Sequence, residues 1–497
     1  MPETIQLSDN SYFSIEEGSA AGKKKIAFFY DDPERKHGDN IMLVLYPPGN
    51  PKVQVPMVYD EARKRYSAEI ERANDAGEKF EIITATELLQ KGFICLKNGE
   101  QQPVNKKPGI PEGTLETLLL TNDGKIKKPD TLDETKLAEG ERFVEVYLPP
   151  GYDAKKQPPY NFQVTLDGGQ YLHLMQMNVI FDNLIAAGQM EPVVTVFISP
   201  HSGPPAPVNK VAGFGVVMPP GYPLSMRLKE YSCNYKFADM LANMTKSLRD
   251  QVNITKEREH TTIWGVSAGG LQSIYTALLH PDVFGNVVAQ SPQAWNIPEQ
   301  LGLGVEGDHW RKGIVEKFDE RGNCTWESAT AKLPDIEGPH NEHITQIMRS
   351  SQDPISGRTL ESSNPIKFFF DAGELEKLYE PKKGSANLVA ATQEFAKATM
   401  QSGHRVIDST VHVLPNGGHH TMTWMRSFAD AARSIHPLTH RLSAEAMPPR
   451  LSMTTHPHQL QFSTPAVPPA PSASAHQTTM DSAPSPTPVA PVNKDKM

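Results

Sequence analysis

The 497-residue sequence predicts an α/β protein, in which a doubly wound, mostly parallel sheet follows a small β-rich, sandwich-like domain. The length exceeds that of a usual single domain, so more than one hydrophobic core is expected. From about Arg142, apolar runs alternate with longer stretches of helical period, which is the pattern of a parallel sheet covered by helices. Before that residue the apolar segments are short and separated by turn residues, which favours strands.

Residues 1–135 are predicted to form the β-rich domain. The segments that favour strands are KKKIAFFYDD, NIMLVLYPPGNP, VQVPMVYDE and YSAEIERAN. Two further segments, ATELLQKG and GTLETLLLTNDGK, fit a strand or a helix equally well. No catalytic cluster stands out in this part of the chain.

Residues 141–438 are predicted to form the α/β domain. Strands are expected at FVEVYLPPGY, NFQVTLDGG, PVVTVFISP, TTIWGVS, GNVVAQSP, IKFFFDAG and STVHVLPNGG. Helices are expected between them, at MQMNVIFDNLIAAGQ, FADMLANMTKSLRDQV, GGLQSIYTALLH, NLVAATQEFAKATMQ and WMRSFADAARSI. The alternation predicts a catalytic-type α/β domain.

Residues 439–497 are rich in Pro, Ser, Ala and Thr and hold few large apolar side chains. Such a segment cannot bury enough apolar surface to offset the entropy lost on ordering, so it is predicted to be disordered. A linker and a segment that docks on another protein both fit this composition.

The composition is that of a soluble protein. The formal charge of −9, from 49 basic and 58 acidic residues, gives no electrostatic reason to expect nucleic acid or an anionic membrane as the main partner. Cys95, Cys233 and Cys324 are too far apart in the chain for a zinc or redox motif. The start of the chain lacks the features of a secretion signal and no apolar run is long enough to span a bilayer, so we expect a cytoplasmic protein.

The segment TTIWGVSAGGLQSIYTALL places Ser267 between Gly265 and Gly269, where an apolar run ends and a helical pattern begins. The glycine-serine-glycine pattern alone is weak evidence, because it arises by chance in roughly one of every several chains of this length. Its position is more informative, since a nucleophile at a sharp strand-to-helix turn needs small residues two places before and after it. The helix start would also direct its dipole and free N–H groups toward Ser267. We therefore predict a nucleophile rather than an inert turn residue.

A serine nucleophile needs a general base, and a histidine in a loop after a late strand can supply it. VHVLPNGGHHTMTW has this form, with His419 and His420 before the last helix. His419 is the first choice because the two preceding glycines let the loop aim it across the sheet edge, and His420 is the alternative. His280 ends the helix that follows Ser267, too far away to act on it, and is predicted to cap that helix.

The acid that orients the histidine is expected between the serine and the histidine in the chain. IKFFFDAGELEKLYE places Asp371, Glu374 and Glu376 at the end of the penultimate strand. These residues alone leave all three carboxylates open as the third member of the triad.

An oxyanion hole needs two backbone N–H groups. One is expected from Ala268, directly after the nucleophile, and the other from the loop that ends the early strand NFQVTLDGG. Gly169 is the first choice for this second donor, and Gly168 and Gln170 are the alternatives. The glycines would let the backbone approach a substrate carbonyl closely.

Together these blocks resemble the esterase D-like α/β hydrolases, and among them most closely the enterochelin (enterobactin) esterases. The similarity extends from about Arg142 to Ile435, and a β-rich domain ahead of the hydrolase domain is also typical of the two-domain enterochelin esterases. The blocks that carry it are RFVEVYLPPGY, LDGG, RLKEYSCNYKF, GVSAGGLQSIYTALLHPDVFG with SPQAW, DAGELE and GGHHTMTW.

The resemblance implies that Ser267 is the nucleophile, His419 the base and Glu376 the acid. By position in the motifs it also implies a set of substrate-binding residues: Arg227, Lys229, Trp295, Trp424 and Arg426. The sequence departs from the family pattern near the expected pocket, where His420 follows His419, Met425 follows Trp424, and residues 203–223 are an addition.

These expectations describe a serine carboxylic-ester hydrolase that forms an acyl-enzyme and needs no metal or organic cofactor. Its partner would be a small-molecule ester, with the trilactone of a ferric siderophore as the substrate that the resemblance implies. The alternatives are a hydrolase-fold binding protein without turnover and an acyltransferase that uses the same serine.

Overall fold

The structure is a computed structural model. It describes residues 2–38, 40–48, 51–129, 132, 137–138, 141–200, 227, 230–231, 233–292, 314–318, 324–328, 353, 356–360, 364–376, 388–401 and 406–438. Four parts of the chain singled out in the sequence lie outside the described residues: Lys229, Trp295, the segment 203–223 and the segment 439–497.

The described residues up to Gln101 form two five-stranded antiparallel sheets from β1 (Glu3–Ser8), β2 (Ser11–Glu17), β3 (Lys23–Asp31), β4 (Met42–Tyr46), β5 (Val53–Pro56), β6 (Val58–Asp60), β7 (Arg65–Ala73), β8 (Gly77–Ile83), β9 (Leu88–Lys97) and β10 (Glu100–Gln101). One sheet has the order β1-β2-β3-β7-β6 and the other β10-β9-β8-β4-β5. Both contribute to one apolar core, in which the Phe80 ring stands edge-on to Phe13 and Phe28 of the other sheet. Shared burial of the inner faces makes this part a β-sandwich.

The described residues from Thr114 onward form a nine-stranded sheet, termed the central sheet, from β11 (Thr114–Leu120), β12 (Ile126–Lys127), β13 (Arg142–Leu148), β14 (Asn161–Leu166), β15 (Val193–Ile198), β16 (Thr261–Val266), β17 (Asn286–Gln290), β20 (Ile366–Gly373) and β21 (Val406–Leu414). Its order is β12-β11-β13-β15-β14-β16-β17-β20-β21. The strands from β15 to β21 in this order are parallel, and those before them are antiparallel. A separate hairpin consists of β18 (Ile314–Phe318) and β19 (Cys324–Ser328).

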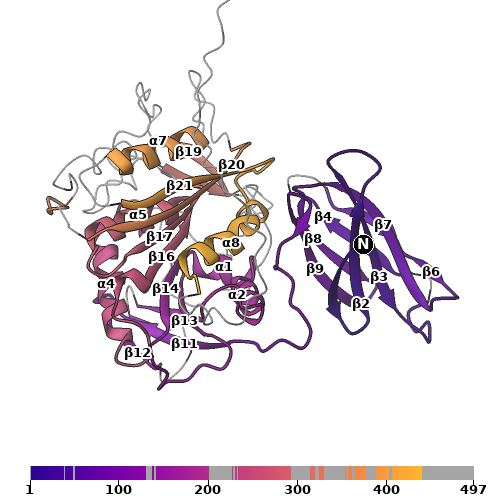
Figure 1. Cartoon of the computed structure of the whole chain (residues 1–497), viewed down its shortest axis with the longest axis horizontal. Coiled ribbons are helices and arrows are strands. Elements are labelled where there is room, and N and C mark those ends of the chain that lie inside the picture. The colour runs from indigo at the N-terminus through magenta and orange to yellow at the C-terminus, as the bar shows by residue number, and fades with distance from the viewer. Residues whose placement is uncertain are drawn as a thin grey trace, which may run out of the picture. The chain divides into compact units, whose positions relative to one another are not determined.

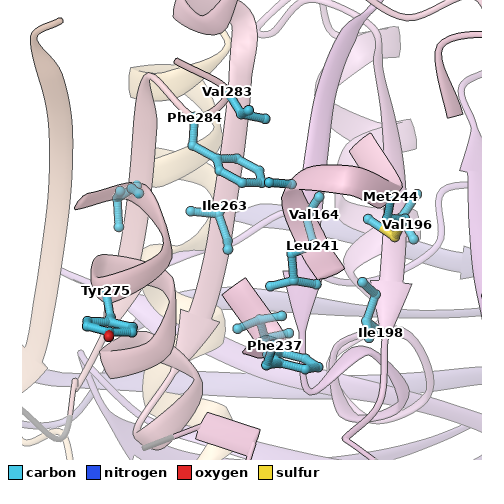
Figure 2. Close-up of a cluster of buried hydrophobic side chains, with 14 of the residues drawn as sticks. Val164, Val196, Ile198, Phe237, Leu241, Met244, Ile263, Tyr275, Val283 and Phe284 are labelled. Atoms are coloured by element: carbon cyan, nitrogen blue, oxygen red, sulfur yellow. The ribbon is translucent and has the colours of Figure 1, made fainter. Parts of the chain in front are cut away.

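Helices cover both faces of the central sheet: α1 (Gly168–His173), α2 (Met177–Ala186), α4 (Tyr235–Leu248), α5 (Ala268–Leu279), α7 (Leu388–Gln401) and α8 (Thr421–Ile435), with a 3₁₀ turn η2 (Arg258–His260). Figure 1 shows α1, α2 and α8 on one face and α4, α5 and α7 on the other, and each group shares a buried apolar cluster with the sheet. In Figure 2, Phe237, Leu241 and Met244 of α4 pack over strand side chains of the sheet, namely Val164, Val196, Ile198 and Ile263. None of the helices in the described part of the chain is long and apolar enough to cross a lipid bilayer.

The predicted fold class is confirmed. Every strand and helix expected after Arg142 is present, and the two ambiguous segments both lie in strands, β9 and β11. Helix α1, which begins within the LDGG block, was not predicted because it is only six residues long. The division at residues 135 and 141 stays a prediction, but β11 and β12 precede it and pair with the central sheet through β13.

The parallel strands place the candidate site residues at one edge of the central sheet. Asp167 follows β14, Ser267 follows β16, Ser291 follows β17, Glu376 follows β20 and His419 follows β21. Because the carboxyl ends of neighbouring parallel strands meet at the same edge, residues far apart in the sequence come together there.

Candidate active site

Ser267 is the single residue between β16 and α5, and its backbone is strained. Its φ is 55° and its ψ is −121°, a combination that residues with a side chain seldom adopt. Its N–H donates to Gln290 O at 2.9 Å, and its carbonyl accepts from Leu271 N–H at 3.1 Å. A Cβ at Gly265 would lie 2.3 Å from Gly269 O, so the turn requires glycine there. The predicted strand-to-helix turn is therefore present.

Glu376 and His419 form a hydrogen-bonded pair beyond β20 and β21. His419 Nδ1 lies 3.3 Å from Glu376 Oε2, and the side chains are 13% and 0% exposed. Glu376 Oε1 accepts from the Ser291 hydroxyl at 2.6 Å and from Gly373 N–H at 3.1 Å. These donors offset the cost of burying a carboxylate, and the carboxylate in turn orients the imidazole through Nδ1.

Two glycines allow the loops that carry this pair to touch. A Cβ on Gly373 would lie 2.4 Å from Gly417 O, so neither loop has room for a side chain at this crossing. Leu375 N–H donates to Gly417 O at 2.8 Å, and Glu374 N–H donates to Leu414 O at 3.0 Å. These bonds fix the acid loop against the histidine loop.

The other two candidate acids have different partners. Glu374 Oε2 accepts from Asn416 N–H at 3.0 Å on the exposed side of the loop. Asp371 is buried, and its Oδ2 accepts from the Gln290 side-chain amide at 2.8 Å and from the Ser427 hydroxyl. Burial raises the pKa of Asp371 to about 7. Of the three carboxylates, all of which the structure describes, Glu376 is the one that hydrogen-bonds to His419.

The end of β17 connects β16, which precedes Ser267, to β20, which precedes Glu376. Gln290 O accepts from Ser267 N–H, and the next N–H, that of Ser291, donates to Asp371 O at 2.8 Å. Both side chains are fully buried. The groups that hydrogen-bond to the Gln290 side chain are Tyr171 OH, Trp264 Nε1, Asp371 Oδ2, Trp424 O and Ser427 Oγ.

Trp424 supports the acid–base pair from α8. Its Nε1 donates to Ser291 Oγ at 2.9 Å, and because an indole nitrogen only donates, the Ser291 proton is directed to Glu376. The Trp424 ring stands edge-on to His419, with 5.1 Å between ring centroids. Trp424 is thus buried against His419 and against the serine that binds Glu376, and its assignment as a substrate-binding residue stays a prediction.

The other two histidines singled out in the sequence, His420 and His280, both lie at helix ends. His420 caps α8, where Nδ1 accepts from Thr423 N–H at 3.3 Å. Burial, together with the nearby charge of Arg426, lowers the pKa of His420 to about 4, so its imidazole is neutral near pH 7. His280 ends α5 with its N–H donating to Thr276 O at 2.9 Å, which confirms the predicted cap.

The two loops predicted to hold an oxyanion lie on neighbouring strands, β14 and β16. Ala268 is the first residue of α5, so its N–H stands outside the helical hydrogen-bond ladder. Gly169 N–H donates to Ser199 Oγ at 3.1 Å, and Gln170 N–H donates to Asp167 O at 2.9 Å. Gly168 N–H has no acceptor among the described residues, so it is the donor of the three that is open in this structure.

Both described arginines of the predicted substrate-binding set are buried. Arg227 forms an ion pair with Asp167. Arg426 Nη1 donates to Asp75 O and to Pro415 O, each at 2.8 Å, and burial lowers its pKa. Their guanidinium groups hold protein carbonyl and carboxylate groups, and their contact with a substrate stays a prediction.

Two arrangements that catalysis or metal binding would need are absent from the described residues. The Ser267 hydroxyl does not hydrogen-bond to His419 or to any other residue in this part of the chain. No group of three or more His, Cys, Asp or Glu side chains there is placed to hold a metal ion. The Glu376–His419 pair is therefore assembled, whereas its contact with Ser267 is not.

Gln290, Ser291 and the carboxylate of Asp167 were not predicted as site residues from the sequence. A signal was available, since each is a polar residue at the end of an otherwise apolar strand. Such residues are often only solvated, and the partners that bury these three come from distant parts of the chain.

A family model described as "Putative esterase" matches residues 135–435, more than half of the chain. The chain belongs to this esterase family. Membership confirms the predicted enzyme class, a carboxylic-ester hydrolase, and the predicted relationship to the esterases.

Solved esterases are similar in structure at low sequence identity. The enterobactin esterase of Shigella flexneri covers 87% of this chain and 96% of its own, at 13% identity and a TM-score of 0.44. The ferric enterobactin esterase of Salmonella typhimurium covers 85% of this chain and 96% of its own, at 13% identity and a TM-score of 0.45. A ferulic acid esterase of Anaeromyces mucronatus covers 67% of this chain and 94% of its own, at 16% identity and a TM-score of 0.37. Similarity at this level does not say which ester this esterase cleaves.

The substitution Asp371→Asn should reduce the pH dependence of the esterase's stability. The pKa of Asp371 is about 7 in the folded protein and about 4 in an unfolded chain, so the folded state binds the proton more tightly. The stability from this group is therefore complete below about pH 4 and is lost as the pH rises to about 7, a difference of a few kcal/mol. Melting temperatures of the wild-type protein and the variant at pH 5 and pH 8 test this. An equal fall in melting temperature from pH 5 to pH 8 in both proteins would contradict it.

The substitution Ser291→Ala should lower kcat for ester hydrolysis about 10-fold with little change in KM, because Glu376 loses a donor and general acid–base catalysis contributes about 10²–10⁴-fold. Trp424→Phe removes the N–H that holds the same hydroxyl, so its effect should not add to that of Ser291→Ala. Ser409→Ala is the control, since Ser409 lies on β21 and its hydroxyl donates to Ala396 O of α7, away from the Glu376–His419 pair. A wild-type kcat in Ser291→Ala would refute the role of Ser291 in holding Glu376. Additive effects of Ser291→Ala and Trp424→Phe on kcat would refute it as well.

Proposed function

We propose that this esterase cleaves its substrate through an acyl-enzyme on Ser267, with His419 as the general base and Glu376 as its acid partner. The observation that carries the proposal is the strained backbone of Ser267 at φ 55° and ψ −121°. Surrounding structure must hold a residue with a side chain at such angles, and residues held in this way cluster at active sites.

In the proposed reaction, Ser267 Oγ forms a bond to the ester carbonyl carbon as His419 Nε2 takes its proton. Negative charge moves to the carbonyl oxygen, which the N–H of Ala268 and an N–H of the Gly168–Gly169 turn would receive. The carbon–oxygen ester bond then breaks and His419 gives its proton to the leaving alcohol. Water attacks the acyl-enzyme with His419 as base, and Ser267 leaves with the proton.

Glu376 holds the imidazole in the orientation and tautomer that this proton transfer needs. Its carboxylate accepts a hydrogen bond from Nδ1–H of His419, so Nε2 is left to take the proton of Ser267. The missing contact between Ser267 and His419 fits a substrate-free enzyme, since catalytic hydrogen bonds often tighten in the complex with substrate. Gly169 N–H is bound to Ser199 Oγ, so its use as an oxyanion donor would require that hydroxyl to move.

The substrate we propose is a small-molecule ester, with a siderophore trilactone as the first to test. Its support is the resemblance of the motif blocks to enterochelin esterases. Arg227 and Arg426 add no support for an anionic ligand, because both are buried against protein groups. One screen of the purified protein against a catecholate trilactone, a feruloyl ester and short acyl esters would identify the class.

The substitution Ser267→Ala should abolish hydrolysis of p-nitrophenyl butyrate, with a loss of at least about 10³-fold in kcat, because it removes the hydroxyl that forms the proposed acyl-enzyme. A fluorophosphonate probe should label the wild-type protein and not the variant. Turnover near the wild-type rate in the variant would refute the nucleophile. Absence of labelling in folded wild-type protein would instead favour a binding protein, and transfer of the acyl group to an added alcohol would favour an acyltransferase.

A further inference from the structure

Arg227 is locked in a bidentate ion pair with Asp167. Its Nε donates to Oδ1 at 2.7 Å and its Nη2 donates to Oδ2 at 2.6 Å. The side chains are only 8% and 1% exposed. Two parallel charge-assisted bonds fix both the distance and the orientation of the two groups, which a single contact would not do.

This ion pair joins the two turns that carry the candidate oxyanion donors. Asp167 directly precedes Gly168, and Arg227 Nη2 also donates to the carbonyl of Val266 at 3.2 Å, the residue before Ser267. One guanidinium therefore holds the end of β14 and the end of β16 together. Asp167 Oδ2 also lies against the first turn of α5, since a Cβ on Gly269 would be 2.9 Å from it.

The backbone of Asp167 is also fixed. Its φ of 57° and ψ of 36° lie in the left-handed region, where Asp and Asn are better tolerated than most residues. Its N–H donates to the Tyr231 hydroxyl at 3.0 Å, and its carbonyl accepts from the N–H groups of Gln170 and Tyr171. The direction of the Gly168 and Gly169 N–H groups thus depends on this one residue.

We infer that the Arg227–Asp167 ion pair positions the oxyanion hole, so that Arg227 is a positioning residue and not a ligand for the substrate. The inference rests on the proposed acyl-enzyme function. Donors stabilise the developing oxyanion only within about 2.7–3.1 Å, so a small shift of one turn relative to the other removes their effect. A buried ion pair is weak evidence for stability alone, because desolvation offsets its attraction, whereas positioning explains why it spans these two turns.

The two roles predict different kinetics. A positioning residue acts on the transition state, so its loss lowers kcat for every ester and leaves KM nearly constant. A substrate-binding arginine would raise KM, and would do so for an anionic ester more than for a neutral one. The substitution Arg227→Lys separates these roles, because lysine keeps the charge but cannot form the bidentate contact together with the bond to Val266 O.

The experiment compares Arg227→Lys with the wild-type protein on p-nitrophenyl butyrate and on p-nitrophenyl hydrogen succinate, which carries a free carboxylate. We expect kcat to fall about 10–100-fold on both esters, as one oxyanion donor is worth about 10²–10³-fold, with KM within about 3-fold. A boron-containing transition-state analogue, butylboronic acid, should bind more weakly by a similar factor. A rise in KM confined to the anionic ester, or wild-type kcat, would overturn the inference.

The matched control is Arg358→Lys. Arg358 also forms a bidentate pair, with Nη1 and Nη2 at 2.5 and 2.7 Å from the carboxylate oxygens of Asp239, away from both turns. The Arg358→Lys substitution should leave kcat within about 2-fold of the wild-type value, since solvent-accessible ion pairs contribute little to the stability of the fold. A loss of kcat as large as that of Arg227→Lys would mean that any lost ion pair has this effect, and would overturn the inference.

Asp167→Asn breaks the same pair from the other side and suits the left-handed backbone, so it replaces Arg227→Lys if that variant does not fold. Fluorophosphonate labelling distinguishes failure of the proposed acyl-enzyme function from failure of the positioning role of Arg227. Absence of labelling at Ser267 in the wild-type protein refutes the proposed function. Labelling there, combined with wild-type kcat in both folded variants, refutes the positioning role alone.

Discussion

The candidate site depends on the hydrogen bonds made by Gln290, the last residue of β17, and by Ser291, which follows it. The Gln290 carbonyl holds the strained turn of Ser267, and the Ser291 hydroxyl holds the buried carboxylate of Glu376. These two contacts lie on consecutive residues, so Ser267 and Glu376 are both fixed to the end of one strand. A buried carboxylate without such donors would be unstable in its charged form, and a strained turn without such anchors would relax. The order of β16, β17 and β20 in the sheet makes both contacts possible.

Several polar side chains near this edge of the central sheet bind other protein groups rather than solvent. Arg227 joins two turns through Asp167, Arg426 joins Pro415 O to Asp75 O, and Trp424 supports Ser291 and His419. Each is buried, so each costs free energy unless its polar groups are paired. The polar groups of these side chains are thus paired with protein groups, and their contact with a substrate stays a prediction.

The sequence was informative where local pattern determines structure. The turn at Ser267 could be predicted because its glycines meet a local steric demand and the flanking residues change from strand to helical spacing. The acid could not be chosen from residues alone, because the choice depends on how Gly373 and Gly417 let two distant loops cross. The motifs imply that Arg227 and Trp424 bind substrate, and this stays a prediction, because a motif does not show which way a side chain turns. Trp295 and the segment 439–497 lie outside the described residues.

The central claim is that Ser267 carries the acyl group during turnover. Rapid acid quenching of the wild-type esterase with excess p-nitrophenyl acetate, followed by peptide mass spectrometry, tests it most directly. The account predicts an acetyl adduct on the peptide that contains Ser267, formed in the same burst as p-nitrophenol release. An adduct confined to another residue, or turnover with no adduct at any quench time under burst conditions, would contradict it.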